Sequence, residues 1–259
     1  MIKALFRSDL HWVTFYLIIF FSWVAVVGLS SETEAPEPFK TIYGPDFWIG
    51  LCRQAAGFED WTLLFAAWAI MSIAMMMPTL LPTLNTYNDL IIGGAGNLRG
   101  FYLVLVGFLF VWFGFSIIFS TLQAYLLEES LVDQTGAFRN KGFAAIFLLI
   151  AGLYQFTPLK ENCVLQCRSP LIFFMEYWDS SSFGSIKMGL RLGMICLGCC
   201  WALMSLAFVG GTMNLGFMGL ATCLMIIEKM PQLGGYVTKP LGAGLICAAA
   251  ITTLGVFEV

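Results

Sequence analysis

The chain has 259 residues, of which 59% are hydrophobic and 11% are charged, and its mean hydropathy is +0.84. Soluble domains are roughly 45–50% apolar and about 25% charged, so too little polar surface is available here to cover a globule in water. The composition argues against a soluble enzyme, a disordered regulator and a secreted disulfide scaffold, and the net charge of −3 gives no basic surface for nucleic acid. It predicts an all-α protein whose surroundings are a lipid bilayer, built as a single helical domain over residues 1–259.

Seven apolar runs follow one another along the chain. A hydrocarbon core of about 30 Å needs roughly 20 apolar residues to cross it, so the runs predict a multi-pass transmembrane helical bundle of about seven spans. The fourth and sixth runs are short and would each need a further turn from their flanks. The runs are Trp12–Leu29, Trp61–Leu81, Phe101–Leu122, Gly142–Phe156, Met188–Val209, Met213–Ile227 and Leu241–Phe257.

The segment Met188–Ile227 holds 40 residues and one charge, Arg191. As one helix it would extend about 60 Å, twice the thickness of the hydrocarbon core. The chain must therefore fold back, and Gly210-Gly211 favours a turn because glycine has no Cβ to hinder it. We expect a tight hairpin there, with Asn214 just beyond it buried and bonded to a neighbouring helix.

Basic residues set the expected orientation. The first run follows Lys3 and Arg7 and has no Ala-x-Ala cleavage pattern after it, so we interpret it as an uncleaved signal anchor. With the N-terminus in the cytoplasm, nine of the thirteen basic residues fall on the cytoplasmic side, as the positive-inside rule requires. An acidic loop over Ser30–Asp60 is then external. The nine are Lys3, Arg7, Arg99, Lys160, Arg168, Lys187, Arg191, Lys229 and Lys239.

Eight cysteines are present, and all except Cys52 fall in predicted spans or in a cytoplasmic loop, where thiols stay reduced. In that loop Cys163 and Cys167 are four residues apart, so a helix bounded by Pro158 and Pro170 would place both sulfurs on one face. The nearby Lys160 and Arg168 favour the thiolate form, which binds soft metals. The alternative is a pair of buried cysteines that only anchor an interfacial helix.

The fifth run carries a second group of sulfur ligands: Cys196, Cys199, Cys200 and Met204. The three cysteines fall within about a 100° sector of a helix with Met204 beside it, and such thiolate and thioether ligands select Cu(I). Cys199 and Cys200 point about 100° apart, so they need not act together. The alternative is packing, because a stripe of small residues runs through the same positions. The stripe comprises Gly189, Gly193, Cys196, Cys200 and Ala207.

Other polar groups at membrane depth are costly and therefore informative. Gln123 and Gln155 end the third and fourth runs, and each is expected to bond across helices. Glu228-Lys229 closes the sixth run and is interpreted as an interfacial charge pair. The single histidine leaves no room for a His-based metal centre or a Ser-His-Asp triad, and no phosphate or dinucleotide motif is present.

Several blocks resemble a bacterial family of predicted metal-binding integral membrane proteins, a domain of unknown function. The resemblance covers about Trp61–Pro231 and implies a bacterial inner-membrane protein that binds a metal. Its most distinctive parts are the two cysteine groups. The blocks are Met71–Pro78, Ala151–Lys160 with Cys163, Cys167–Pro170, Gly189–Met204, Gly211–Asn214 and Glu228-Lys229.

Two functions remain open at this point. One is a protein that binds or moves a soft transition metal, copper(I) in the first place and zinc in the second, through Cys163, Cys167, Cys196, Cys199, Cys200 and Met204. The other is a structural or assembly subunit of a larger membrane complex, whose cysteines only pack. A membrane enzyme ranks last because no acid/base or cofactor motif is recognisable.

Overall fold

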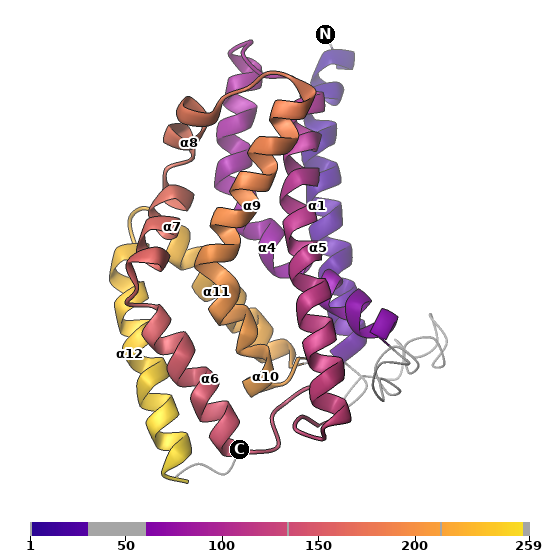
Figure 1. Ribbon diagram of the computed structural model, residues 1–259. Coiled ribbons are helices and arrows are strands. Elements are labelled where there is room, and N and C mark those ends of the chain that lie inside the picture. The colour runs from indigo at the N-terminus through magenta and orange to yellow at the C-terminus, as the bar shows by residue number, and fades with distance from the viewer. Residues whose placement is uncertain (1, 31–60, 134, 213, 256–259) are drawn as a thin grey trace.

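The computed structural model describes residues 2–30, 61–133, 135–212 and 214–255 (Figure 1). In these ranges the chain is helical apart from short connections, with no β-strand and only an isolated bridge between Val132 and Phe138. The all-α class is confirmed, while most of the predicted acidic loop, with Cys52, lies outside the described residues. The helices are α1 (Ile2–Ser30), α4 (Trp61–Ile92), α5 (Leu98–Glu128), α6 (Lys141–Tyr154), α7 (Pro158–Arg168), α8 (Pro170–Tyr177), α9 (Ser182–Ser205), α10 (Ala207–Gly210), α11 (Leu215–Lys229) and α12 (Gly234–Thr253).

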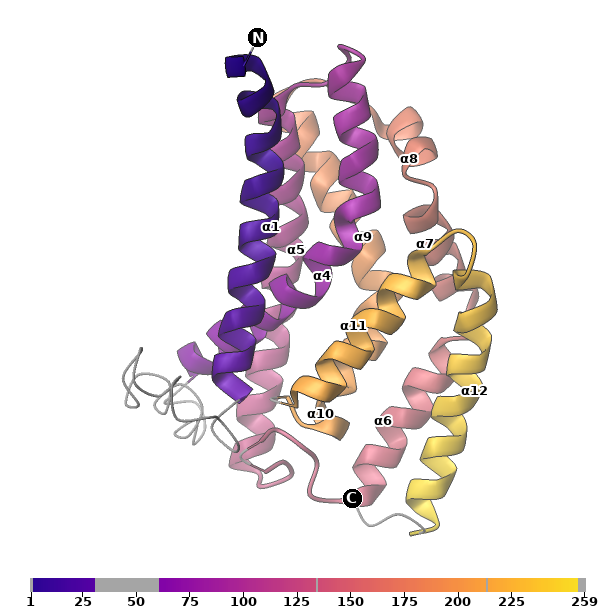
Figure 2. The ribbon, with the colours of Figure 1, turned by 180° about the vertical axis from the view of Figure 1, so that it is seen from behind.

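The long helices α1, α4, α5 and α9 run side by side along the bundle (Figure 1). Helix α4 packs against α1 and α5, and α5 packs against α9. The chain then returns along the side of the bundle opposite α1 through α6, α7 and α8, as Figure 2 shows. Helices α11 and α12 form a hairpin whose turn lies near α7, and α12 returns along α6. Helix α1 therefore begins at one end of the bundle, and α12 finishes at the other.

Glycines bring α5 and α9 into close contact. A Cβ on Gly189 would lie 2.2 Å from the carbonyl oxygen of Val104, and one on Gly107 would lie 2.4 Å from that of Ile186. No side chain fits at such distances, so the two backbones approach because these residues have none. The glycine part of the predicted small-residue stripe thus packs against α5.

Two prolines divide the segment between α6 and α9. Thr157 caps α7, its hydroxyl accepting the N–H of Lys160, and Pro158 follows as the first helical residue. Pro170 is likewise the first residue of α8, although the side chain of Ser169 before it forms no capping hydrogen bond. Proline lacks an N–H and clashes with a preceding helical turn, so each starts a new helix, and α7 is bent by 63° from α6. The predicted short helix bounded by Pro158 and Pro170 is confirmed.

All seven predicted runs coincide with helices over the described residues, but they are not seven full spans. Four helices are long and apolar enough to cross a membrane: α1, α4, α5, and α9 continued through α10. The bent pair of α6 and α7 would be a fifth. Helix α11 has 15 residues, and neither it nor α12 qualifies. Several helices are therefore suited to a membrane, whereas the count of seven is not confirmed.

The predicted reversal after the fifth run is present. Helix α10 ends at Gly210, and Gly211 has a φ of +87°, a backbone conformation that residues with a Cβ rarely adopt. The expectation for Asn214 is wrong. Its side chain is exposed, and its oxygen accepts the N–H of Phe217 at 3.0 Å, because the first N–H groups of α11 lack partners within the helix.

The two glutamines behave differently. Gln123 accepts a hydrogen bond from the indole N–H of Trp68 at 2.7 Å, which joins α5 to α4 as predicted. Gln155 is buried at the end of α6, but neither atom of its amide has a partner among the described residues. The expected bond across helices is therefore found only for Gln123.

Candidate metal centre

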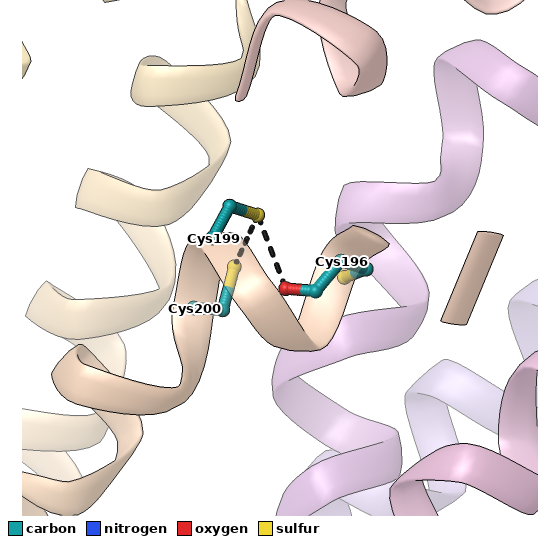
Figure 3. Close-up of side chains that lie close together, drawn as sticks. All are labelled: Cys196, Cys199 and Cys200. Carbon is teal, nitrogen blue, oxygen red and sulfur yellow. Dashed lines mark hydrogen bonds between the residues drawn. The ribbon is translucent and has the colours of Figure 1, made fainter. Parts of the chain in front are cut away.

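Three thiols of α9 form a compact, buried group. The sulfurs of Cys196, Cys199 and Cys200 all lie within 4.8 Å of one another, and all three residues are buried (Figure 3). A metal–sulfur bond of about 2.3 Å places two ligand sulfurs at most about 4.6 Å apart. The three sulfurs are thus close to the spacing of ligands to one ion.

Helix α7 brings a fourth thiol to this group. The sulfurs of Cys167 and Cys199 are 3.9 Å apart, although 32 residues separate them in the chain. Cys163, half-buried on the same helix, packs against Gly198, where an added Cβ would lie 2.7 Å from its sulfur. The sequence suggested two separate sulfur sites, on α7 and on α9. The structure instead brings Cys167 of α7 beside the α9 thiols, and we call these four residues, Cys167, Cys196, Cys199 and Cys200, the thiol cluster.

Cys199 and Cys200 are also closer than their helical positions suggest. Their sulfurs lie 3.2 Å apart, and the Cys199 thiol donates to the carbonyl oxygen of Cys196 at 3.1 Å (Figure 3). The two sulfurs therefore lie side by side, although the helical positions of the two residues point about 100° apart. Met204 is buried one helical turn beyond Cys200.

A lysine that the sequence placed at the membrane interface lies in this cluster instead. The ammonium group of Lys229 donates to the sulfur of Cys196 at 3.0 Å and to the hydroxyl of Thr79 at 2.8 Å. Lys229 ends α11, Thr79 lies in α4 and Cys196 in α9, so three helices meet here. The sequence marked this residue only by its place in a charged pair at the end of an apolar run and by the family resemblance of that pair.

The preceding residue, Glu228, binds α7. Its carboxylate lies 2.8 Å from the ammonium group of Lys160, and both side chains are buried. The backbone carbonyl of Glu228 also accepts the Nε–H of Arg168 at 2.8 Å. Glu228 and Lys229 are thus not an interfacial pair with each other. Lys160 was expected to favour the thiolate form of the cysteines on its own helix, but it forms an ion pair with Glu228. The lysine that donates a hydrogen bond to a sulfur is Lys229.

The donor set suits a soft ion. All seven cysteines of the described ranges are free thiols, and the clustered ones are held by helices rather than by loops. Thiolate ligands favour Cu(I) and zinc over hard ions such as Mg²⁺. Gly189 and Gly193 of α9 pack on α5, whereas Cys199 of the same helix lies against Cys167 of α7, so the stripe glycines and this cysteine have different neighbours.

Comparison with protein families identifies the chain's relatives. Residues 65–252 match the family model described as PpoB2, copper chaperone. The chain belongs to this copper chaperone family. No curated protein and no solved structure matches it. The matched region contains every cysteine of the cluster, so family membership and the thiol geometry both point to copper.

Proposed function

We propose that this protein is a membrane copper chaperone that holds Cu(I) between α7 and α9. The observation that carries the proposal is the distance of 3.9 Å between the sulfurs of Cys167 and Cys199, which brings together thiols that are far apart in the sequence. The ligands would be drawn from Cys167, Cys196, Cys199 and Cys200, whose sulfurs are buried from water. Cu(I) prefers such soft ligands, and a reduced thiol site holds copper in this oxidation state.

We propose that the other two candidate ligands, Cys163 and Met204, take part in moving the ion into or out of the cluster. Cys163 is the most exposed thiol of α7 and lies against the α9 turn that carries Cys199. We propose that copper enters or leaves the buried cluster through Cys163. Met204 continues the cluster along α9, and its buried thioether would extend the path on the other side of Cys200.

The proposed location is the bacterial inner membrane, with the N-terminus in the cytoplasm. Helices α1, α4, α5 and α9, with the bent pair α6–α7, supply five crossings. Helix α11 is only about 22 Å long at 1.5 Å per residue, less than the hydrocarbon thickness. We propose that α11 and α12 form a hairpin that enters the membrane from the external side and returns to that side. This hairpin replaces two further crossings.

Metal analysis of detergent-purified protein tests the proposal. We expect about one Cu(I) per chain in the wild type, and loss of binding in Cys167→Ser/Cys199→Ser with the helical circular dichroism retained. Cys223→Ala and Cys247→Ala, which remove exposed thiols outside the cluster, serve as matched controls and should bind as the wild type does. Zinc in place of copper would overturn the choice of metal. No metal at all would favour a structural subunit whose cysteines only pack.

A further inference from the structure

Lys229 is a buried cation that has no carboxylate partner among the residues that the structure describes. Its side chain is 6% exposed, and none of the described carboxylates forms an ion pair with it. The adjacent Glu228 is directed to Lys160, and these two opposite charges offset each other. One positive charge is therefore left in excess beside the thiols. An unbalanced charge is expensive in a protein interior, so its presence calls for an anion at this place.

The hydrogen bonds of Lys229 hold this charge at the cluster. The hydroxyl of Thr79 donates to the carbonyl of Met76 at 2.8 Å, which leaves the oxygen of Thr79 to accept from Lys229. A second ammonium hydrogen points at the sulfur of Cys196. Anchored on α4 and ending at a candidate ligand, the ammonium group is placed to act on whatever the thiols bind.

We infer that Lys229 is the counter-cation of the copper–thiolate complex and makes the site prefer monovalent over divalent soft ions. This inference rests on the proposed function. Two thiolates around Cu(I) carry one net negative charge, and three carry two. With the same number of thiolates, a Zn(II) complex is always one unit more positive. A fixed cation beside the ligands therefore stabilises the Cu(I) complex more than the Zn(II) complex.

The experiment compares affinities for the two ions in the same full-length protein. Cu(I) and Zn(II) are titrated anaerobically into detergent-purified wild type and Lys229→Met, each against a chromophoric chelator. Lys229→Met keeps the length of the side chain and removes its charge. We expect its Cu(I) affinity to fall about 10- to 100-fold, the range typical of lost outer-shell partners, and its Zn(II) affinity to fall less. The ratio of the two affinities is the readout, because general damage would lower both together.

Two further variants complete the design. Lys229→Arg keeps the charge and should preserve the ratio. Lys187→Met removes an exposed charge from the same helix as the thiols and should leave both affinities unchanged. If Lys229→Met does not fold, Lys229→Gln, which can still bond to Thr79, replaces it and is interpreted in the same way. A ratio unchanged in the neutral variant overturns this inference alone, whereas a wild type that binds no Cu(I) overturns the proposed function.

Discussion

A cysteine sulfur lies one bond beyond the position that a helical wheel describes. The Cβ atoms of Cys199 and Cys200 are about 100° apart on α9, yet their sulfurs are 3.2 Å apart. Rotation about one side-chain bond is sufficient to turn both sulfurs toward each other. Vicinal cysteines on a helix can therefore bring their sulfurs together, and here a neighbouring helix, α7, adds the thiol of Cys167 beside them.

Gly189 is a sensitive position for stability. A Cβ there would lie 2.2 Å from the backbone carbonyl of Val104, which cannot move aside as a flexible side chain would. We expect Gly189→Ala to destabilise the protein by about 1–3 kcal/mol, as overpacking does, by separating α5 from α9. Thermal unfolding in detergent, followed by circular dichroism, measures the effect.

Gly114 on α5 provides the control. A Cβ at this position has no heavy atom within 4 Å outside its own helix. Because alanine is also the better helix former, Gly114→Ala should be neutral or slightly stabilising. Equal melting temperatures for the two variants would contradict the close contact of α5 with α9.

Helix α7 is held at both of its ends by contacts with a single residue of α11, Glu228. The carboxylate of Glu228 binds Lys160 in the first turn, and its carbonyl accepts from Arg168 in the last. Pro158 and Pro170 separate α7 from its neighbours in the chain. The position of Cys163 and Cys167 over α9 therefore depends on contacts with α11.

Removing one partner of the Lys160–Glu228 ion pair should loosen the packing of α7 against α11. Lys160→Met leaves the Glu228 carboxylate buried without its partner, and its second oxygen already lacks one among the described residues. We expect a loss of about 3–5 kcal/mol, the usual effect of removing one partner of a buried pair, and faster alkylation of Cys167. Thermal unfolding and the rate of thiol labelling measure these two effects.

The double variant Lys160→Met/Glu228→Leu separates charge from packing. Replacing both partners by apolar side chains leaves no unbalanced charge, so it should be less destabilising than Lys160→Met alone. Glu161→Gln, which changes an exposed carboxylate on the same helix, is the control and should have no effect. A double variant as unstable as the single one would contradict this role for the ion pair.

Over the whole molecule, the basic residues orient the bundle less strongly than the sequence suggested. Lys160 and Lys229 are buried, and in the five-crossing arrangement Lys239 lies on α12, so these three residues do not belong to cytoplasmic loops. Without them the bias is six against four, which still favours a cytoplasmic N-terminus. We expect reporter fusions to place the N-terminus in the cytoplasm and the end of α12 outside. Both ends on one side would rule out an odd number of crossings.

The turn between α11 and α12 distinguishes five crossings from seven. Seven crossings would expose Gln232 to the cytoplasm. A hairpin that enters the membrane from the external side would instead keep Gln232 inside the membrane. Because α11 has only 15 residues, we expect a short epitope tag inserted after Gln232 to be inaccessible to antibody in inside-out vesicles. A tag inserted after Gly94, in the turn that follows α4, is the positive control. Antibody binding at Gln232 would restore the seven-span arrangement.

Much of this architecture follows from local sequence. Runs of apolar residues determine where helices form, because a backbone in lipid must satisfy its hydrogen bonds within the helix. Pro158, Pro170 and Gly211 mark the breaks, since proline cannot continue a helix and glycine tolerates a positive φ. The soft-metal character of the cysteines is likewise a property of the residues themselves, and it agrees with membership of a copper chaperone family.

What the sequence could not determine is which of these residues meet. Cys167 lies 32 residues from Cys199, Lys229 lies 33 from Cys196, and Glu228 lies 68 from Lys160. Periodicity describes one helix at a time, whereas these contacts depend on how far each helix extends and how it is tilted against the others. Only the packing of α7 and α11 against α9 joins two thiol groups into one cluster and places a buried cation beside it.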